Sequence, residues 1–187
     1  MQKLIDILEK YTSISDEAKV ELGRIVSKKK LAKGQIVLQQ GNICRNLYFV
    51  ESGFLRGFYS QEGKDISSWF ALENDIAAAM YSFVTQKPSF ESIEVLEESV
   101  VYQIAYQELQ NLYYKYMEMN MIGRLITEKY YIILEERKNA LQYQSAKERY
   151  KYIVENQPKL LQKASLGMIA SYLGITQETL SRIRNKI

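Results

Sequence analysis

The feature that most constrains the fold is a series of short β-rich runs, separated by glycine, in the first half of the chain. Between Lys33 and Ala105, runs such as GQIVLQQG, NLYFVESG and FLRGFYSQEG are rich in Val, Ile, Tyr and Phe and end at glycine. Such runs are typical of strands in an antiparallel barrel or roll. Glycine supplies the positive φ that the turns between them require. The sequence therefore predicts an antiparallel β-roll, with short helices in front of it, in an α+β fold.

A different texture follows between about Tyr106 and Tyr143, where the chain has no proline and no glycine except Gly123. Apolar residues recur there at a spacing of seven, which is typical of a long helix with an apolar seam. Two interpretations are open: the seam packs on its own chain, or it pairs with the same helix of a second subunit. The predicted dimer seam consists of Met119, Ile122, Ile126, Ile133 and Ala140.

A third region begins at Ser145. Ser145 and Glu148 have the spacing of a capping box, which predicts that a new helix begins there and that the long helix ends near Tyr143. Pro158 is expected to close the new helix, and the segment KLLQKAS after it is expected to form one or two short strands. The predicted parts of the chain are a roll over residues 1–116, a connecting dimerisation helix over 117–143 and a C-terminal domain over 144–187.

The last stretch, IASYLGITQETLSRIRNKI, has the pattern of two short helices joined by a tight turn. We expect one helix over 166–173 and a second over 177–186. Gly174 would supply the left-handed residue of the turn, and Thr176 would be the N-cap of the second helix. Such a pair is a helix-turn-helix, whose second helix enters the major groove of DNA, and we expect it within a winged-helix-like C-terminal domain. An ordinary helical hairpin with charged outer faces is the alternative.

The outward face of the second helix has the chemistry that base recognition needs. Arginine can donate two hydrogen bonds to guanine, and glutamate can accept one from cytosine. The candidate DNA-contacting residues are Thr176, Gln177, Glu178, Ser181, Arg182, Arg184 and Lys186. Basic residues that are candidates for contacts with the DNA backbone are Lys147, Arg149, Lys151 and Lys163.

The charge of the chain is distributed unevenly. From Ser145 onward there are eight Lys and Arg against three Asp and Glu, a balance of +5. The remainder holds 17 basic residues (25 minus 8) and 19 acidic ones (22 minus 3), a balance of −2, which together give the net charge of +3. A basic segment behind a slightly acidic body favours a polyanion as partner of the C-terminal domain.

The composition argues against enzymes and metal sites. The chain has one cysteine, Cys44, and no histidine. One thiol cannot form an internal disulfide, a cysteine-held iron–sulfur cluster or a structural zinc site. Without histidine the chain lacks the commonest general base and metal ligand. We therefore expect no catalytic residues, no metal and no cofactor. The longest uncharged apolar stretch, residues 76–84, is too short to cross a membrane, and a cytoplasmic protein without a membrane partner is expected.

The sequence resembles the Crp/Fnr family of bacterial transcription regulators over nearly its whole length. IASYLGITQETLSRIRNK is similar to the family's DNA-binding motif in the form found in Bacteroidetes-type members. Glu178 and Arg182 match the pair with which the family reads a G·C pair in each half-site. Ser181 matches the oxygen-regulator branch, and Gln177 departs from the arginine of the cAMP receptor. The resemblance implies a homodimer on a palindromic double-stranded DNA site, and RNA polymerase as a further partner.

The glycine-spaced runs resemble the family's cyclic-nucleotide-binding β-roll. Cyclic-nucleotide binders of the family use a Gly-Glu-Leu turn and then an arginine beside a small hydroxyl residue. Aligned by Asp75 and Phe83, this chain has AAAMYSF over that turn, with Ala79 in place of the glutamate. The arginine and its neighbour fall at about Ser89 and Phe90. A buried phosphate needs a cationic partner, so we expect that cAMP and cGMP do not bind tightly.

Three roles for the roll remain open: binding of a less charged ligand, a structural dimer platform without a ligand, or sensing through a partner protein. A less charged ligand would lie among Ala77, Ala78, Ala79, Met80, Phe83, Ser89 and Phe90. An alternative for the whole chain is a ligand-binding module whose C-terminal helices make protein contacts only. A cupin-type enzyme is disfavoured because such enzymes hold their metal with histidine.

Overall fold

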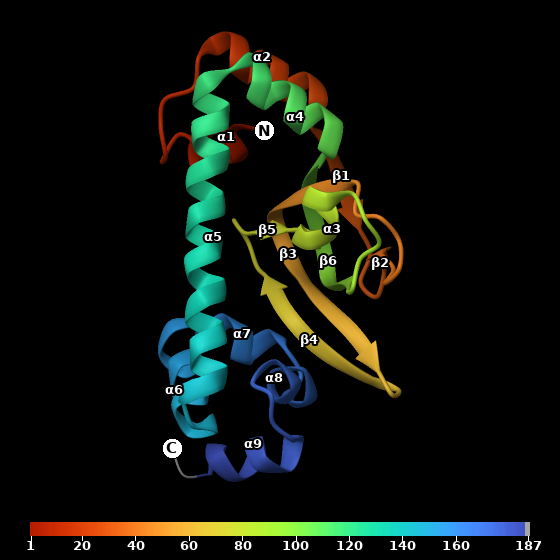
Figure 1. The fold of residues 1–187 in the computed structure, drawn as a ribbon, viewed down its shortest axis with the longest axis vertical. Helices are drawn as coiled ribbons and strands as arrows, with labels where there is room; N and C mark the ends of the chain where they lie inside the picture. The colour runs from red at the N-terminus through yellow and green to blue at the C-terminus, as the bar shows by residue number, and fades with distance from the viewer. Residues whose placement is uncertain (186–187) are drawn as a thin grey trace.

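The structure is a computed structural model that describes residues 1–185 of the chain. A long helix, α5 (Met117–Tyr143), runs along one side of the molecule in Figure 1. The N-terminal helices α1 (Gln2–Leu8) and α2 (Asp16–Ile25) lie near one end of it, together with α4 (Tyr106–Lys115). The sheet lies beside the middle of α5, and the C-terminal helices lie at its other end.

Within the described residues, six strands form one antiparallel sheet in the order β1-β6-β3-β4, with β2 paired to β6 and β5 paired to β3. The predicted β-roll is therefore confirmed. The strands are β1 (Ser27–Leu31), β2 (Ile36–Leu38), β3 (Asn46–Gln61), β4 (Lys64–Ala71), β5 (Ile76–Ala77) and β6 (Ser92–Ala105).

The central strands β3 and β6 bend where their register shifts, between Val50 and Leu55. Extra residues at such bulges curve a strand and increase its twist. Gly53 lies in this bend with φ +111°, and a Cβ there would come within 2.0 Å of the Ser99 side chain. The position therefore requires glycine for its backbone angle and for the close approach of β6.

Local capping signals set several helix ends, including the start predicted at Ser145. The Ser15 side chain accepts a hydrogen bond from the Ala18 N–H at the start of α2. Ser145 and Glu148 form a complete capping box at the start of α6 (Ala146–Asn156). Each cap satisfies backbone donors that have no partner inside the helix.

The short strands expected after Pro158 are wrong, because this segment forms helix α7 (Pro158–Lys163). Proline suits the first position of a helix, and Leu, Gln and Lys are good helix formers. The helical turn buries Leu160 to 2% exposure. Within the described residues the C-terminal part is helical throughout, with α8 (Leu166–Tyr172) and α9 (Gln177–Arg184) after α7, and without the strands of a winged helix.

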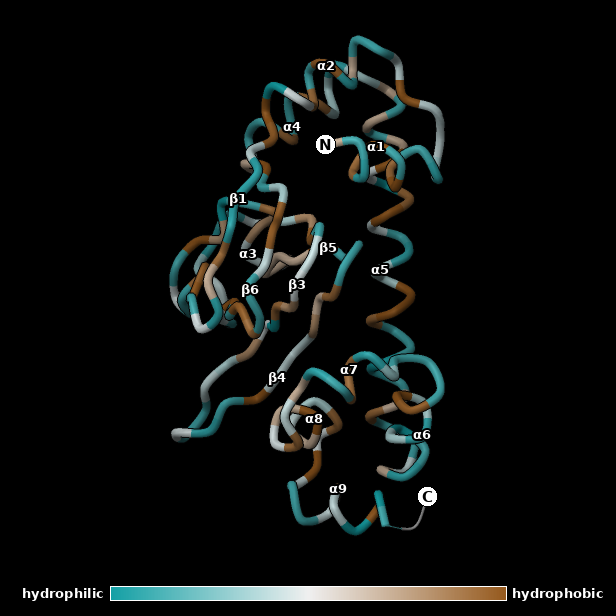
Figure 2. The backbone as a smooth tube through the Cα atoms, turned by 180° about the vertical axis from the view of Figure 1, so that it is seen from behind, coloured by the Kyte–Doolittle hydropathy of each residue, from teal (hydrophilic) through white to brown (hydrophobic). Residues whose placement is uncertain are grey.

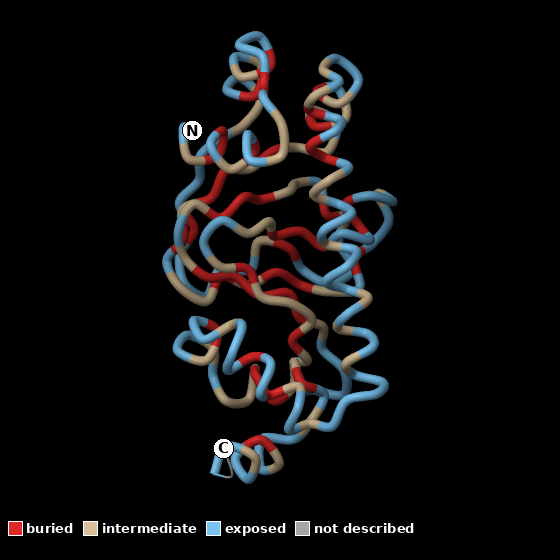
Figure 3. Tube along the Cα trace, turned by 90° about the vertical axis from the view of Figure 1, so that its left-hand side faces the viewer, coloured by how far each residue is buried: buried red, intermediate tan, exposed pale blue. Residues whose placement is uncertain are grey.

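Two hydrophobic cores lie one above the other along α5 (Figure 3). The first joins the roll, the N-terminal helices, α4 and the start of α5. The second lies among the C-terminal helices, and Phe54 of the roll is part of it. The Phe54 ring stacks on Phe70 of β4, and Phe70 meets the ring of Tyr172 edge-on. The roll and the C-terminal helices therefore share buried apolar surface.

The predicted dimer seam on α5 requires a correction. Met119 and Ile122 are 3% and 1% exposed and belong to the first core, and Ile126 packs against it. Gly123 lets the Tyr113 ring of α4 lie directly on α5, since a Cβ there would be 2.5 Å from the ring. This part of the stripe is covered by the same chain and is not free for a second one. Of the five predicted residues, Ile133 is exposed and Ala140 is half-buried.

Replacing Phe54 by alanine is expected to lower the free energy of unfolding by about 3–5 kcal/mol, because the ring is fully buried between the roll and the C-terminal helices. Urea unfolding followed by circular dichroism measures this change. Phe90→Ala is the control, because that ring is 66% exposed and its loss should change stability by less than about 0.5 kcal/mol. Equal effects of the two variants would contradict the shared core.

Helices that are long and apolar enough to cross a membrane are absent from residues 1–185. The same described residues hold no group of three or more His, Cys, Asp or Glu side chains placed to bind a metal ion.

Candidate nucleic-acid interface and roll pocket

Helices α8 and α9 form the predicted helix-turn-helix. Gly174 adopts φ +68° just after α8, and the Ile175 N–H donates to the Ala170 carbonyl at 3.0 Å. The Thr176 side chain accepts from the Thr179 N–H at 3.2 Å and caps α9, as expected. The left-handed glycine and the N-cap reverse the chain within a few residues, which brings the two helices into contact.

A small apolar core holds the two helices together. Ile169, Leu173 and Leu180 are buried, and Leu180 has no exposed surface. Ala170 is 2% exposed at the point where the helices approach, where a larger side chain would separate them. Ile175 and Ile183 pack against the same cluster. The apolar residues of this motif all serve packing, so its polar residues are left on the outside.

The outward face of α9 carries the predicted DNA-contacting residues. The exposed ones are Thr176, Gln177, Glu178, Ser181, Arg182 and Arg184. Lys186, also predicted, lies outside the described residues. Arg182 is one turn after Glu178, so the two side chains share one side of the helix. Hydrogen bonds from its own backbone N–H and from Thr176 hold the pKa of the Glu178 carboxyl below its usual range, which keeps it an ionised acceptor.

Three of the four basic residues predicted to reach the DNA backbone have other partners in the structure. Arg149 donates to the carbonyl oxygens of Leu173 and Gln144. Lys163 pairs with Glu97, and Lys151 pairs with Glu155 at 3.6 Å. The prediction is wrong for Arg149, because its guanidinium is used inside the molecule. Lys147 is exposed.

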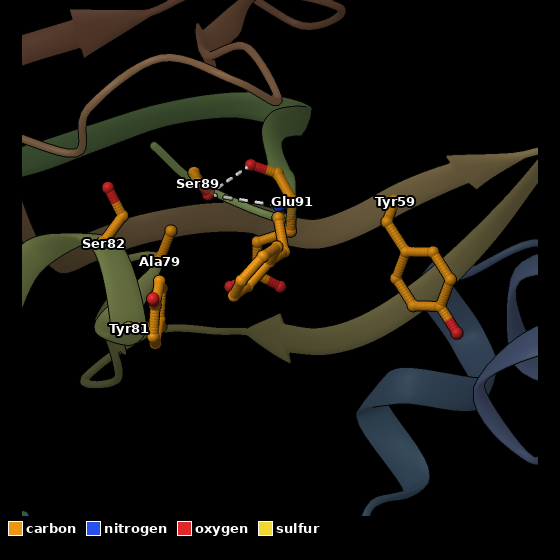
Figure 4. Close-up of a pocket in the computed structure, with 7 residues that line it drawn as sticks. Tyr59, Ala79, Tyr81, Ser82, Ser89 and Glu91 are labelled. Atoms are coloured by element: carbon orange, nitrogen blue, oxygen red, sulfur yellow. Dashed lines mark hydrogen bonds between the residues drawn. The ribbon is translucent and has the colours of Figure 1, made fainter. Parts of the chain in front are cut away.

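A cavity of about 230 Å³ lies in the roll beside α3 (Met80–Thr85) (Figure 4). Its lining residues are Tyr59, Ala79, Tyr81, Ser82, Ser89, Phe90 and Glu91. Ala79, Ser89 and Phe90 were predicted. Ala77, Ala78 and Phe83 lie instead in the core of the roll, and Met80 is exposed outside the cavity. Tyr59 was missed because it comes from β3, and only the folded sheet brings that strand to the cavity.

The two serine hydroxyls of this cavity already have partners within the chain. Ser82 Oγ accepts from the Cys44 N–H at 2.8 Å and donates to the Lys87 carbonyl at 2.5 Å. Ser89 Oγ accepts from the Glu91 N–H and donates to the Glu91 carbonyl, as the dashed lines of Figure 4 show. These hydroxyls hold the loop after α3 in place and have little capacity left for a ligand.

The charged residue of the cavity is a carboxylate. Glu91 accepts hydrogen bonds from Trp69 Nε1 at 3.0 Å and from Ser68 Oγ. Burial raises the pKa of the Glu91 carboxyl, and in neither protonation state does it offer a positive charge. Among the described residues that line the cavity there is no lysine or arginine. The remaining surface is aromatic, with Tyr81 and Phe90 in contact at a ring distance of 4.6 Å.

A β-roll joined through a long helix to a helix-turn-helix defines a class of transcription regulators that bind DNA. The model of the cyclic nucleotide-binding domain matches residues 28–116. The comparisons support a transcription regulator of the Crp/Fnr family, and the regulators that the chain resembles are not enzymes.

Sequence comparisons find regulators of this family, and structure comparisons find the same fold. The fumarate and nitrate reduction regulatory protein of Yersinia pestis is 27% identical over 181 residues, which cover 87% of this chain and 70% of that protein. FixK2 of Bradyrhizobium japonicum has a TM-score of 0.74 at 18% identity, over 87% of this chain and 84% of that one. A regulator of the Crp/Fnr family from Eubacterium rectale has a TM-score of 0.72 at 18% identity, over 92% and 83% of the two chains. At such identities the two structures show a shared fold.

Proposed function

We propose that the chain works as a homodimer that reads a palindromic DNA site with α9, and that its roll does not bind a cyclic nucleotide. The observation that carries the proposal is the outward face of α9, where Glu178 and Arg182 lie exposed one turn apart on a helix packed by its opposite face. Both side chains lie on the exposed face of the helix, where a partner can reach them.

The polar side chains of α9 would contact different groups of the DNA. Arg182 would donate two hydrogen bonds to guanine O6 and N7, and Glu178 would accept one from cytosine N4. Thr176 and Gln177 lie at the N-terminus of the helix, which favours contact with phosphate. Ser181 and Arg184 would contact neighbouring positions. A G·C pair in each half-site is therefore expected.

The dimer would form on the face of α5 that points away from the roll. Met121, Leu125 and Ile132 follow one another at intervals of four and seven residues, which places them on one side of the helix. Met121 is 42% exposed and Ile132 is 56% exposed. Hydrophobic residues recur along the whole of α5 in Figure 2. Two such helices side by side would bury this seam and place two recognition helices about 34 Å apart.

The first test of this function is selection of random duplex DNA by the purified full chain, at several salt concentrations and with and without cAMP. A palindromic consensus with a G·C pair in each half, obtained without cAMP, is expected. Recovery of no consensus would contradict sequence-specific reading by α9. RNA polymerase, the partner expected from the family, can then be tested by transcription from a promoter that carries the selected site.

Cyclic AMP is expected not to bind the roll measurably. Its phosphate would meet the Glu91 carboxyl and aromatic rings, without the cationic partner that a buried phosphate needs. Thermal unfolding with cAMP at about 1 mM provides the measurement, since a ligand at about 100 times its Kd would stabilise the fold by about 2.7 kcal/mol. Calorimetric titration of a known cyclic-nucleotide-binding protein is the positive control. A clear shift with cAMP would overturn this view of the cavity.

A further inference from the structure

Two arginines from different helices bind the carbonyl groups at the C-terminal end of α8, where the turn of the helix-turn-helix begins. Arg137 of α5 donates from Nη2 to the Tyr172 carbonyl at 3.3 Å. Arg149 of α6 donates from Nε and Nη2 to the Leu173 carbonyl at 3.1 and 2.9 Å. The last carbonyls of a helix lack partners within it and carry the negative end of its dipole. We call Arg137 and Arg149 the arginine clamp.

Arg137 is held on several sides. Its guanidinium carbon lies 4.0 Å from the centre of the Tyr172 ring, which is the geometry of a cation–π contact. Burial lowers the pKa of this guanidinium, and the charged or titratable groups around it are Tyr172, Tyr59 and Glu91. A half-buried arginine keeps its planar contacts only while the groups around it stay in place. Arg137 therefore ties α8 to α5 with defined geometry.

The other side of α8 is held by β4. The Ser67 N–H donates to Ser171 Oγ at 3.2 Å, and the Phe70 ring lies 5.2 Å from the Tyr172 ring. Figure 1 shows α8 between α5 and β4, with α9 beyond it on the far side from the sheet. The exposed recognition residues of α9 take no part in these contacts. Helix α8 is therefore held in place, while the outward face of α9 remains accessible to DNA.

Arg149 adds a link to the end of the long helix. Its Nη1 donates to the Gln144 carbonyl at 2.5 Å, at the junction of α5 and α6. One guanidinium thus binds the last carbonyls of α5 and of α8 at once. The dimer axis would run along α5, and α9 follows α8 through the tight turn at Gly174. The contacts that hold α8 on α5 therefore also set the orientation of α9 relative to the dimer axis.

We propose that the arginine clamp is a positioning device, which fixes the angle of the helix-turn-helix to α5 and thereby sets the half-site spacing that a dimer accepts. The proposal rests on the proposed function and adds to it. Each of these contacts of the clamp is made within the chain. A dimer without the clamp would keep its recognition residues, but its two α9 helices would bind half-sites at several separations.

The test compares the wild-type full chain with Arg137→Met and Arg137→Lys on duplexes whose half-site spacer is changed by one or two base pairs. Because loss of this contact frees the end of α8 from α5, Arg137→Met should lose about tenfold or more in affinity at the selected spacing. Its preference for that spacing over the altered ones should fall markedly. Arg137→Lys, which keeps the charge but not the planar fork, should lose part of that preference. Unchanged spacing preference in Arg137→Met would overturn the proposal.

Lys138→Met is the matched control, because it removes a positive charge one residue further along α5. The Lys138 side chain is 53% exposed and pairs with Glu135, so spacing preference should not change. Should Arg137→Met fail to fold, Tyr172→Leu removes the ring under the guanidinium, and Tyr172→Phe should restore wild-type spacing preference.

A second measurement tests the clamp without DNA. Double electron–electron resonance measures the distance between two spin labels, one at Glu136→Cys on α5 and one at Ser181→Cys on α9. The labelled chains are diluted with unlabelled protein, so that the distance measured lies within one chain. Cys44 is buried, at 2% exposure, and should not be labelled. Arg137→Met should broaden this distance distribution, and an unchanged distribution would reject the clamp. If wild-type protein selected no DNA but the distribution broadened, the proposed function would fail and the clamp would stand.

Discussion

Replacing Arg182 by alanine should abolish sequence-specific DNA binding and leave the fold unchanged. The side chain is exposed on α9, outside the packed face that Leu180 and Ile183 form, so its loss should not affect unfolding. One good bidentate contact with guanine is worth about 1–3 kcal/mol of discrimination, and a dimer makes two of them. The expected loss at the selected site is therefore about 2–6 kcal/mol, or about 30-fold to more than 10,000-fold in Kd.

The effect should be confined to specific binding. Contacts with phosphate supply most of the affinity for random DNA, and the other basic residues of the C-terminal domain remain in this variant. Fluorescence anisotropy with the selected duplex and a scrambled one, at two salt concentrations, separates sequence-specific affinity from non-specific affinity.

Lys151→Ala is the matched control, since Lys151 is an exposed cation in the same domain that already pairs with Glu155. It should leave discrimination between the two duplexes unchanged. An Arg182→Ala variant that still discriminates them would favour the alternative function, a module whose C-terminal helices contact only proteins.

Replacing Ile132 by arginine should convert the dimer to monomers. In a helix pair that uses the outward face of α5, this side chain would lie in the middle of the seam, and arginine would place two like charges in an apolar contact. An unpaired charge in such a place costs several kcal/mol, so the dimer dissociation constant should rise by at least about 100-fold. Sedimentation equilibrium measures it directly.

Leu134→Arg is the control for charge and size. Leu134 is 59% exposed, against 56% for Ile132, but two residues along a helix turn a side chain to the opposite side. This variant should remain a dimer. Dissociation by both substitutions, or by Leu134→Arg alone, would place the contact on another face of α5.

Much of the DNA-binding motif could be predicted from the sequence because its signals are local. Gly174 marks the turn and Thr176 the N-cap, since a left-handed residue and a capping oxygen each act within one turn of helix. Ser15 and Ser145 mark helix starts for the same reason. The β-roll was predictable from glycine-bounded runs, because alternation and turns are read over a few residues.

Other predictions failed where a residue's role depends on what lies opposite it. The spacing of Met119 and Ile122 suits a seam with any partner, and the partner is the chain's own α4 and roll. Arg149 has the charge of a phosphate ligand but binds two helix ends instead. The segment after Pro158 is helical because the helix places Leu160 in the C-terminal core.

By itself the sequence determined the kind of protein: a roll, a long helix and a helix-turn-helix with Glu178 and Arg182 outward. These features follow from turn chemistry, capping and periodicity, which act between near neighbours. The tertiary structure alone decided which face of α5 stays free, which groups line the cavity and how Arg137 reaches Tyr172. These are contacts between residues far apart in the chain, and only packing in three dimensions selects among the partners that the same apolar or charged side chain could take.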